Sequence, residues 1–418
     1  MKESHDKSAA RIEGDIADLA AFGGDGRGVT RLAYTDADAA AHSRLADLMA
    51  EAGLRVTYDA VGNLSGVWQA EADQSAVIMV GSHLDTVPQG GRFDGVAGLV
   101  VGLEAIRRLR RRSYRPARPI ELIAFRNEEG VRWGAGFTGS RAILGVLDPV
   151  ELDGPPDAEG ITQAEAMRRL GIKPEDAPRA ARRPGSIFAY IEVHIEQGPI
   201  LDSRNLPVGV VTGIAGPAYL NVSVFGQASH AGAMPMDLRR DALAGAAELI
   251  LAVEDAARAT RGQVVATVGK IQVSPGAANV VPGRAVFSVD YRSMDEAARA
   301  RLAGEIRAQA ADIARRRDLS IEVTATKAYA PVAMAEHMID LLAAATAAIA
   351  VPVQRLHSGA AHDATNIAAS ASTGMLFVRS IGGISHSPDE LTRSDDLATA
   401  AAVLEEAVMR LTGPVQGS

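Results

Sequence analysis

Two short apolar runs with a helical pattern between them constrain the fold of this chain most strongly. The runs are "AVIMV" (76–80) and "PIELIAF" (119–125), and "GVAGLVVGLEAIRRLRRR" (95–112) lies between them. Continuous apolar runs of this length suit strands of a parallel sheet covered on both faces. Basic residues at the end of the middle segment suit a helix C-terminus. The succession of strand, helix and strand predicts an α/β domain with a mostly parallel sheet.

A different pattern begins at about Thr212. "YLNVSVFG" (219–226) and "AVFSVDYR" (285–292) alternate between apolar and polar residues, so each strand has one apolar face. Two helical patterns, at roughly 237–257 and 295–316, can cover that face. We therefore expect an α+β domain at 213–329, inserted between the first part (1–212) and the second part (330–418) of the α/β domain.

Composition narrows the classes of partner. The net charge of −8 argues against a nucleic-acid partner, which requires a basic surface. The sequence has no cysteine, so any metal must be bound by histidines and carboxylates. It shows no apolar leader and no run of about 20 apolar residues. We expect a cytoplasmic protein that does not enter the membrane.

Polar residues follow the predicted strands of the α/β domain. "GSHLDTVPQGGRFDGVAG" contains His83, Asp85 and Asp94, and the other segments are "RNEEG" with Glu128 and Glu129, "VHIEQG" with His194 and "GGISHSPDE" with His386. Each segment alone has an ordinary explanation as a solvated histidine, a polar turn or a core histidine. Together, three histidines and two carboxylates, Asp94 and Glu129, suffice for two metal ions with Asp94 as the bridge. Adjacent acids point in different directions, so one of Glu128 and Glu129 can bind metal while the other serves as a base.

The ordered set of motifs resembles a known family. "TRLAYTDADAAA", "GSHLDTVPQGGRFDGVAG", "RNEEGVRWG", "HIEQGPIL", "QASHAGAMPMDLRRDAL", "SGAAHDA" and "GGISHSPDEL" are similar to segments of the N-carbamoyl-L-amino-acid hydrolase, allantoate amidohydrolase and ureidopropionase family. That family lies within the dimetal aminoacylase and peptidase superfamily. The resemblance covers nearly the whole chain.

The resemblance implies a role for each site residue. His83, Asp94 and His194 would bind one metal, and Asp94, Glu129 and His386 the other. Glu128 would be the general base, and Asp85 would orient the ring of His83. A strained cis peptide is expected between Asp94 and Gly95. The residues expected to contact substrate are Gln197, His230, Asn279, Arg292, Gly359 and Ala360, with His230 also acting in catalysis.

The resemblance also implies how the inserted domain is used. As a ferredoxin-like lid, it would close over the site and form a homodimer, with His230 reaching the site of the partner subunit. Two positions depart from the family pattern. Ala361 stands where relatives usually have Gly, and Arg379 stands where Pro is common.

The expected function is metal-dependent hydrolysis of the carbamoyl C–N bond of N-carbamoyl-L-amino acids. Allantoate amidohydrolysis is the main alternative, and an aminoacylase or dipeptidase on the same fold is a weaker one. A metal-binding protein without catalysis is disfavoured because a purely structural site does not need Glu128. Mixed nitrogen and oxygen ligands admit two divalent ions of Mn, Zn, Co or Ni.

Overall fold

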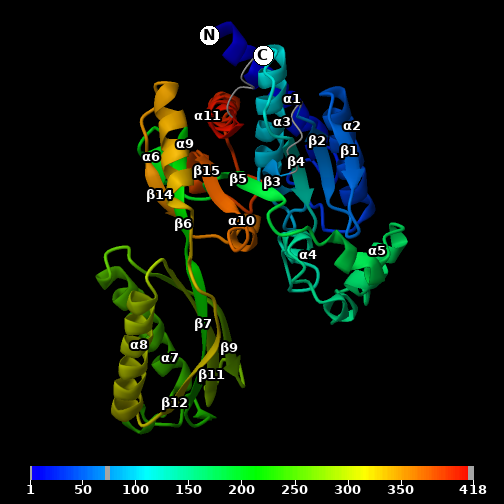
Figure 1. Cartoon of the computed structure of the whole chain (residues 1–418). Helices are drawn as coiled ribbons and strands as arrows, with labels where there is room; N and C mark the ends of the chain where they lie inside the picture. The colour runs from blue at the N-terminus through cyan, green and yellow to red at the C-terminus, as the bar shows by residue number, and fades with distance from the viewer. Residues whose placement is uncertain (1, 71–75, 413–418) are drawn as a thin grey trace. The chain divides into compact units, whose positions relative to one another are not determined.

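The computed structural model describes residues 2–70 and 76–412, and the chain divides into two compact units. The first unit comprises residues 1–212 and 333–418, and the second comprises residues 213–332 (Figure 1). Each unit has its own sheet and helices.

The sheet of the first unit is parallel at its centre and antiparallel at its edges. Its strand order is β1-β2-β4-β3-β5-β15-β6-β13, with β14 paired to β6. Strands β4, β3, β5 and β15 are mutually parallel. The antiparallel pairs include β1 with β2, β2 with β4 and β6 with β15. The bounds are β1 Arg55–Tyr58, β2 Leu64–Trp68, β3 Val77–His83, β4 Ile120–Phe125, β5 Ile187–Ile195, β6 Val208–Ile214, β13 Val332–Ala333, β14 Arg355–Ser358 and β15 Ser372–Val378.

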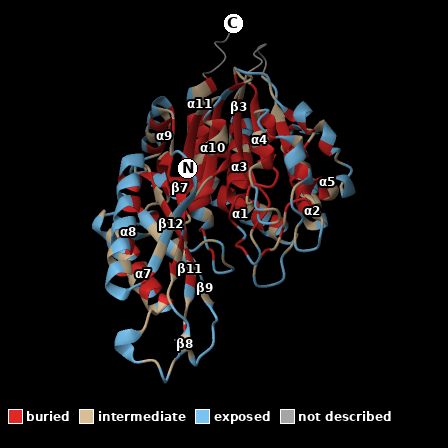
Figure 2. Cartoon of the chain, turned by 90° about the horizontal axis from the view of Figure 1, so that it is seen from below, coloured by how far each residue is buried: buried red, intermediate tan, exposed pale blue. Residues whose placement is uncertain are grey.

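Helices cover the central strands of this sheet. Helix α3 contacts β3, β4 and β5 and packs against α1 and α11, while α10 contacts β5 and β15 (Figure 1). The strands beneath them are almost entirely buried, as the continuous apolar runs predict (Figure 2). The bounds are α1 Lys2–Ala20, α2 Asp36–Glu51, α3 Val96–Arg111, α4 Thr138–Ile143, α5 Gln163–Arg169, α6 Ile200–Ser203, α9 Glu336–Ala348, α10 Asp363–Ile367 and α11 Ser394–Thr412. Within the described ranges, no helix combines the length and apolar character needed to cross a membrane.

The parallel centre of the sheet brings distant segments to one edge. Strand β3 ends at His83, β5 ends one residue after His194, and Glu128 lies three residues after the end of β4. The carboxyl ends of parallel strands meet at the same edge of a sheet, where ligands of α/β proteins collect. This edge therefore receives the polar side chains that the sequence places after each strand.

The second unit is a four-stranded antiparallel sheet with two long helices. The strand order is β12-β7-β11-β9, and the element order is the β-α-β-β-α-β succession of ferredoxin-like domains. Side chains on one face are buried with α7 and α8, among them Leu220, Val222, Phe287 and Val289, as the alternating pattern predicts. The bounds are β7 Gly216–Phe225, β8 Ser229–His230, α7 Ala242–Ala259, β9 Val265–Ser274, β10 Val280–Val281, β11 Arg284–Ser293, α8 Glu296–Arg317 and β12 Ser320–Ala328.

Helix α7 begins five residues later than the helical pattern suggested. Its first residue is Ala242, and Asp241 is the N-cap, whose side chain accepts hydrogen bonds from the N–H groups of Leu243 and Ala244. Residues 236–238 form a short 3₁₀ turn instead. An aspartate at this position satisfies the otherwise unpaired first N–H groups of the helix, and so sets its start.

Candidate active site

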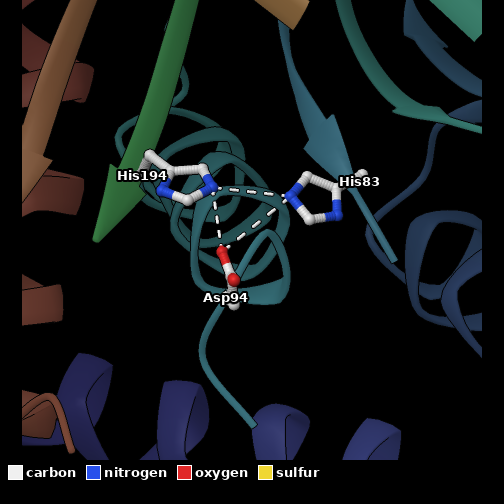
Figure 3. A group of neighbouring side chains, drawn as sticks. All are labelled: His83, Asp94 and His194. Atoms are coloured by element: carbon white, nitrogen blue, oxygen red, sulfur yellow. Dashed lines mark hydrogen bonds and ion pairs between the residues drawn. The ribbon is translucent and has the colours of Figure 1, made fainter. Parts of the chain in front are cut away.

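Three buried side chains converge at the edge of the sheet in the first unit. His83 at the end of β3, His194 near the end of β5 and Asp94 before α3 point toward one another (Figure 3). Nε2 of His194 lies 3.1 Å from Oδ1 of Asp94 and 3.5 Å from Nε2 of His83. Ligand atoms around a tetrahedral metal with bonds of about 2.1 Å are separated by about 3.4 Å. The spacing therefore suits a metal ion.

The other oxygen of Asp94 faces a second group. Nε2 of His386 lies 3.1 Å from Oδ2 of Asp94 and 3.7 Å from Oε1 of Glu129. Asp94 thus presents one oxygen to each group, which is the arrangement of a carboxylate that bridges two cations. The structure brings together all five residues that the sequence suggested as metal ligands.

Main-chain carbonyl groups orient the two buried histidines. Nδ1 of His83 lies 2.9 Å from the carbonyl oxygen of Asp85, and Nδ1 of His194 lies 2.9 Å from that of Ile195. A carbonyl oxygen only accepts, so each Nδ1 donates its proton. This leaves Nε2 of each ring on the side of Asp94, where it is the nitrogen available to bind a metal ion.

The side chain of Asp85 has a different contact from the one expected. The orienting acceptor for His83 is the Asp85 carbonyl oxygen, whereas the Asp85 carboxylate lies 3.9 Å from the ring. The carboxylate instead accepts hydrogen bonds from the N–H groups of Glu128 at 3.1 Å and Glu129 at 3.2 Å. It therefore holds the turn that carries the proposed base and one proposed ligand.

The donor set fits cations. Oε1 of Glu129 is buried and has no hydrogen-bond partner among the described residues. Burial, followed by the charge of Asp94, raises the pKa of Glu129 to about 8. Burial opposes ionisation of Asp94, but hydrogen bonds from His194 and His386 outweigh it, and the pKa of Asp94 lies well below its usual range. Bound cations would allow these closely spaced buried carboxylates to be ionised together.

Glu128 lies beside this group. It is buried, and its Oε2 is 3.8 Å from Nε2 of His83. Burial, followed by the charge of Glu129, raises the pKa of Glu128 well above its usual range. Bound cations would lower the pKa again, because they favour the ionised form. A carboxyl group whose pKa is raised by burial and lowered by bound cations can serve as both a base and an acid.

The peptide bond between Asp94 and Gly95 is trans in the structure, so the expectation of a cis bond at this position is wrong. Gly95 turns the chain instead, with φ 65° and ψ −51°, and the N–H of Val96 donates to the carbonyl of Asp94 at 2.6 Å. These angles and this bond describe a γ-turn. Glycine adopts a positive φ without a steric penalty, so the sharp turn before α3 forms with a trans bond.

Three site residues other than glycine also have left-handed backbones. These are Asn127 (φ 52°), Gln197 (φ 56°) and His386 (φ 55°). Asn127 is held by hydrogen bonds from its amide to Ala135 and Thr138, each at 2.9 Å. Such conformations persist where the surroundings enforce them, and they concentrate at functional sites.

Two further predicted contacts lie in the first unit. The amide of Gln197 lies 3.3 Å from Oδ2 of Asp94 and 3.4 Å from Nε2 of His386. Gly359 and Ala360 follow β14, where the hydroxyl of Ser358 accepts the N–H of Ala360 at 3.1 Å. His362 fixes this loop, since its Nε2 is 2.9 Å from the Ser358 hydroxyl.

The other predicted substrate contacts lie in the second unit. His230 is exposed, and its Nδ1 accepts the N–H groups of Gly232 at 3.1 Å and Ala233 at 3.2 Å. Asn279 lies next to it, because the N–H of Ala231 donates to the Asn279 carbonyl at 2.9 Å. The guanidinium of Arg292 donates to both oxygens of Asp290, at 2.9 and 2.7 Å.

Several residues around the site have roles that sequence reasoning missed. The ring of His362 packs against the ring of His194 in a tilted arrangement, with 4.4 Å between the ring centroids. Glu390 accepts main-chain hydrogen bonds from Phe93 and Asp94. His362 and Glu390 stand inside the "SGAAHDA" and "GGISHSPDEL" motifs, which are the only sequence signal of their position.

Arg379, one of the two departures from the family pattern, has a defined partner. Its guanidinium donates to both oxygens of Asp396, at 2.9 and 2.8 Å, and to Asn205 at 2.8 Å. Its main-chain N–H donates to the carbonyl of Pro207 at 3.0 Å, which a proline at this position could not do. Arg379 therefore ties the end of β15 to α11. Ala361, the other departure, lies half-buried in the loop between Ala360 and His362.

Comparison with known proteins agrees with this geometry. The model of peptidase family M20/M25/M40 matches residues 79–410. The chain belongs to this family. An N-carbamoyl-L-amino acid amidohydrolase of Geobacillus stearothermophilus is 43% identical, over 92% of this chain and 93% of the relative. The allantoate amidohydrolase of Escherichia coli strain K12 is 33% identical, over 94% and 95%.

Solved structures of the family have the same fold. A hydantoinase/carbamoylase family amidase from Burkholderia multivorans superimposes with a TM-score of 0.90 at 35% identity, and covers 97% of this chain and 98% of its own. Membership in the M20/M25/M40 family and these curated relatives identify the chain as a hydrolase that acts on amides.

Proposed function

We propose that this M20/M25/M40 member is a dimetal hydrolase of the carbamoyl C–N bond in N-carbamoyl-L-amino acids. The observation that carries the proposal is the division of the Asp94 oxygens between two ligand groups, with buried Glu128 beside them. The identity of 43% to an N-carbamoyl-L-amino acid amidohydrolase supports this substrate class. His83, Asp94 and His194 would hold one ion, and Asp94, Glu129 and His386 the other.

The chemistry follows from the positions of these groups. When bound, two divalent ions supply Lewis-acid activation of water and of the scissile carbonyl. Glu128 takes a proton from the attacking water and returns it to the leaving nitrogen. Water adds to the carbamoyl carbon, the bond to the amino-acid nitrogen breaks, and the products are the amino acid and carbamic acid. Carbamic acid then decomposes to ammonia and carbon dioxide.

His230 is suited to stabilise the negative oxygen that forms during attack. Its Nδ1 accepts two main-chain N–H groups, so a neutral ring carries its proton on Nε2. An exposed Nε2–H is a donor that can approach a developing oxyanion. We place Gln197, Asn279, Gly359 and Ala360 around the ureido group of the substrate, on the basis of the family resemblance.

Arg292 would bind the substrate carboxylate. Asp290 holds its guanidinium through Nε and Nη2 and raises its pKa further above the usual value. A planar guanidinium binds carboxylates in a defined orientation and stays charged. We expect L-carbamoyl acids to be substrates and their carboxamides to be poor ones.

The second unit is proposed to act as the lid and to form a homodimer. Strand β9 is at an edge of the sheet as described, and it leaves Val265 58% and Ile271 46% exposed. Leu251 on α7 is 62% exposed. An edge strand with exposed apolar side chains is a site for pairing with another chain. By family resemblance, dimer formation would bring His230 to the site of the partner subunit.

Mixed subunits test this arrangement. A His230→Ala chain and a Glu128→Gln chain are each expected to be inactive, and exchange of subunits should restore activity. In a heterodimer, one site combines an intact base with an intact histidine from the other chain. A mixture that stays inactive after verified exchange would show that His230 does not act in trans.

A substrate panel tests the proposed function itself. Ammonia release is measured with N-carbamoyl-L-amino acids, their carboxamides and allantoate, and release of the free amino acid is measured with N-acetyl amino acids, each with Mn, Zn, Co or Ni. We expect the highest kcat/KM with an N-carbamoyl-L-amino acid. Allantoate is the second candidate, because an allantoate amidohydrolase is 33% identical over nearly the whole chain. A clear preference for allantoate or for N-acetyl amino acids would overturn the assignment. A cytoplasmic location stays a prediction.

A further inference from the structure

Glu390 joins the two segments that carry Asp94 and His386. Its Oε1 accepts hydrogen bonds from the N–H groups of Phe93 at 3.0 Å and Asp94 at 3.1 Å. Its Oε2 accepts the hydroxyl proton of Ser385 at 2.8 Å. These partners are almost 300 residues apart in sequence, and Ser385 directly precedes His386. One carboxylate therefore connects the turn before α3 with the loop after β15.

The His386 loop is also held at its start, where the N–H of Gly382 donates to the carboxylate of Asp202 at 2.9 Å. The side chain of His386 is 50% exposed, its backbone is left-handed, and the preceding Gly382 and Gly383 also have positive φ. At its base the loop is closed by a hydrogen bond from the N–H of Ile381 to the carbonyl of Leu391 at 2.8 Å. Glu390 lies just inside that closure and is 5% exposed.

The packing around Glu390 is tight on the side of the Asp94 turn. A Cβ added at Gly91 would lie 2.0 Å from Oε1 of Glu390 and 2.4 Å from its Cβ. Gly91 thus leaves the space that Glu390 fills. The carboxylate is enclosed, and its hydrogen bonds to described residues all go to these two segments. Its position therefore fixes the position of one segment relative to the other.

We propose that Glu390 is a positioning residue that assembles the second metal site, the one formed by Asp94, Glu129 and His386. It acts through the main chain of Asp94 and through Ser385, without binding the ion itself. This inference rests on the metal pair proposed above. Groups that orient metal ligands in this way typically change metal affinity by about 10- to 100-fold when they are removed.

The structure predicts different effects for three substitutions. Glu390→Ala removes all three hydrogen bonds and should weaken binding of the second ion by about 10- to 100-fold. Ser385→Ala removes only the link to the loop, so the second ion should be weakened while the ion held by His83 and His194 keeps its affinity. Glu390→Gln should keep near-normal affinity, because its amide oxygen can accept both N–H groups and its amide nitrogen can donate to the Ser385 hydroxyl.

The experiment measures metal binding with the full chain. Each variant is stripped with a chelator, and Mn²⁺ or Zn²⁺ is titrated by calorimetry and equilibrium dialysis to obtain two dissociation constants. Glu405→Ala is the matched control, since Glu405 is also buried in the first unit but pairs with Arg108 and Arg112. We expect this control to bind both ions as the wild type does.

The outcomes separate the inference from the function on which it rests. A wild-type chain that binds fewer than two ions would refute the proposed metal pair itself. If the wild type binds two ions, the inference is overturned by normal affinities in Ser385→Ala, or by a Glu390→Gln variant that binds as weakly as Glu390→Ala. Ser385→Ala removes one hydroxyl group, so it provides the test even if Glu390→Ala does not fold.

Discussion

Replacing Asp85 with Asn perturbs the turn that carries Glu128 and Glu129. The Asp85 carboxylate accepts one N–H from each of these residues, at 3.1 and 3.2 Å, and it is buried. Asparagine keeps one acceptor oxygen but places an NH₂ donor against the other N–H. One charge-assisted hydrogen bond is lost, and a buried donor is left unpaired.

The magnitude follows from that lost bond. A hydrogen bond to a charged group contributes about 1.5–3 kcal/mol. If the whole of this free energy is lost from stabilisation of the transition state, kcat falls by about 10- to 150-fold. Burial raises the pKa of Asp85 to about 7, so removing the charge also removes a desolvation cost. These effects oppose each other, and the free energy of unfolding should change less than the barrier to catalysis.

The assay separates two roles for Asp85. We expect Asp85→Asn to retain the ion held by His83 and His194, because the main-chain carbonyl of Asp85 orients His83 and is unchanged. Elemental analysis and the rate of ammonia release are measured on the same preparation. Loss of that ion would show that the carboxylate orients His83 after all, and an unchanged kcat would refute its role in holding the Glu128 turn.

Four further results are expected. Glu128→Gln should keep the metal content and reduce kcat by at least about 100-fold, the lower range for acid–base catalysis, so near-normal turnover would remove it from the mechanism. Asp94→Ala should lose both ions, because each ligand group uses one of its oxygens; two ions per chain by elemental analysis would contradict the bridge. Arg379→Met leaves Asp396 buried without its partner and should lower the free energy of unfolding in urea by about 3–5 kcal/mol, and an unchanged midpoint would argue against this contact. Since the raised pKa of Asp85 means that the folded state binds more protons, metal-free wild type should lose stability relative to Asp85→Asn as pH rises from about 4 to about 7; parallel stability profiles would contradict this.

Much of the architecture could be read from local patterns. The continuous apolar runs predict the buried strands β3 and β4, and alternation predicts which face of β7 and β11 is buried. These predictions succeed because burial acts on each side chain separately, and the periodicity of the chain records it. Asp241, by contrast, sets the start of α7 through a local cap that the broader helical pattern did not reveal.

The members of the candidate site could also be named from the sequence, since few residue types bind metals and each followed a predicted strand. The hydrogen bonds that these residues make could not be predicted from the sequence. Whether the carbonyl or the carboxylate of Asp85 meets His83 depends on where β4 ends beside β3, and the amides of Glu128 and Glu129 compete for that carboxylate. The trans bond at Gly95 likewise belongs to the turn before α3, in which Gly95 has φ 65° and ψ −51°.

The sequence by itself determined which residues are available for metal binding and acid–base chemistry. Only the tertiary structure decided that Glu390 meets the amide of Asp94 across 296 residues, and that Arg379 pairs with Asp396 on α11. The physical reason is that a pattern along the chain records how each residue meets its local neighbours and the solvent. A hydrogen bond between distant segments depends on packing that brings both partners within about 3 Å of each other.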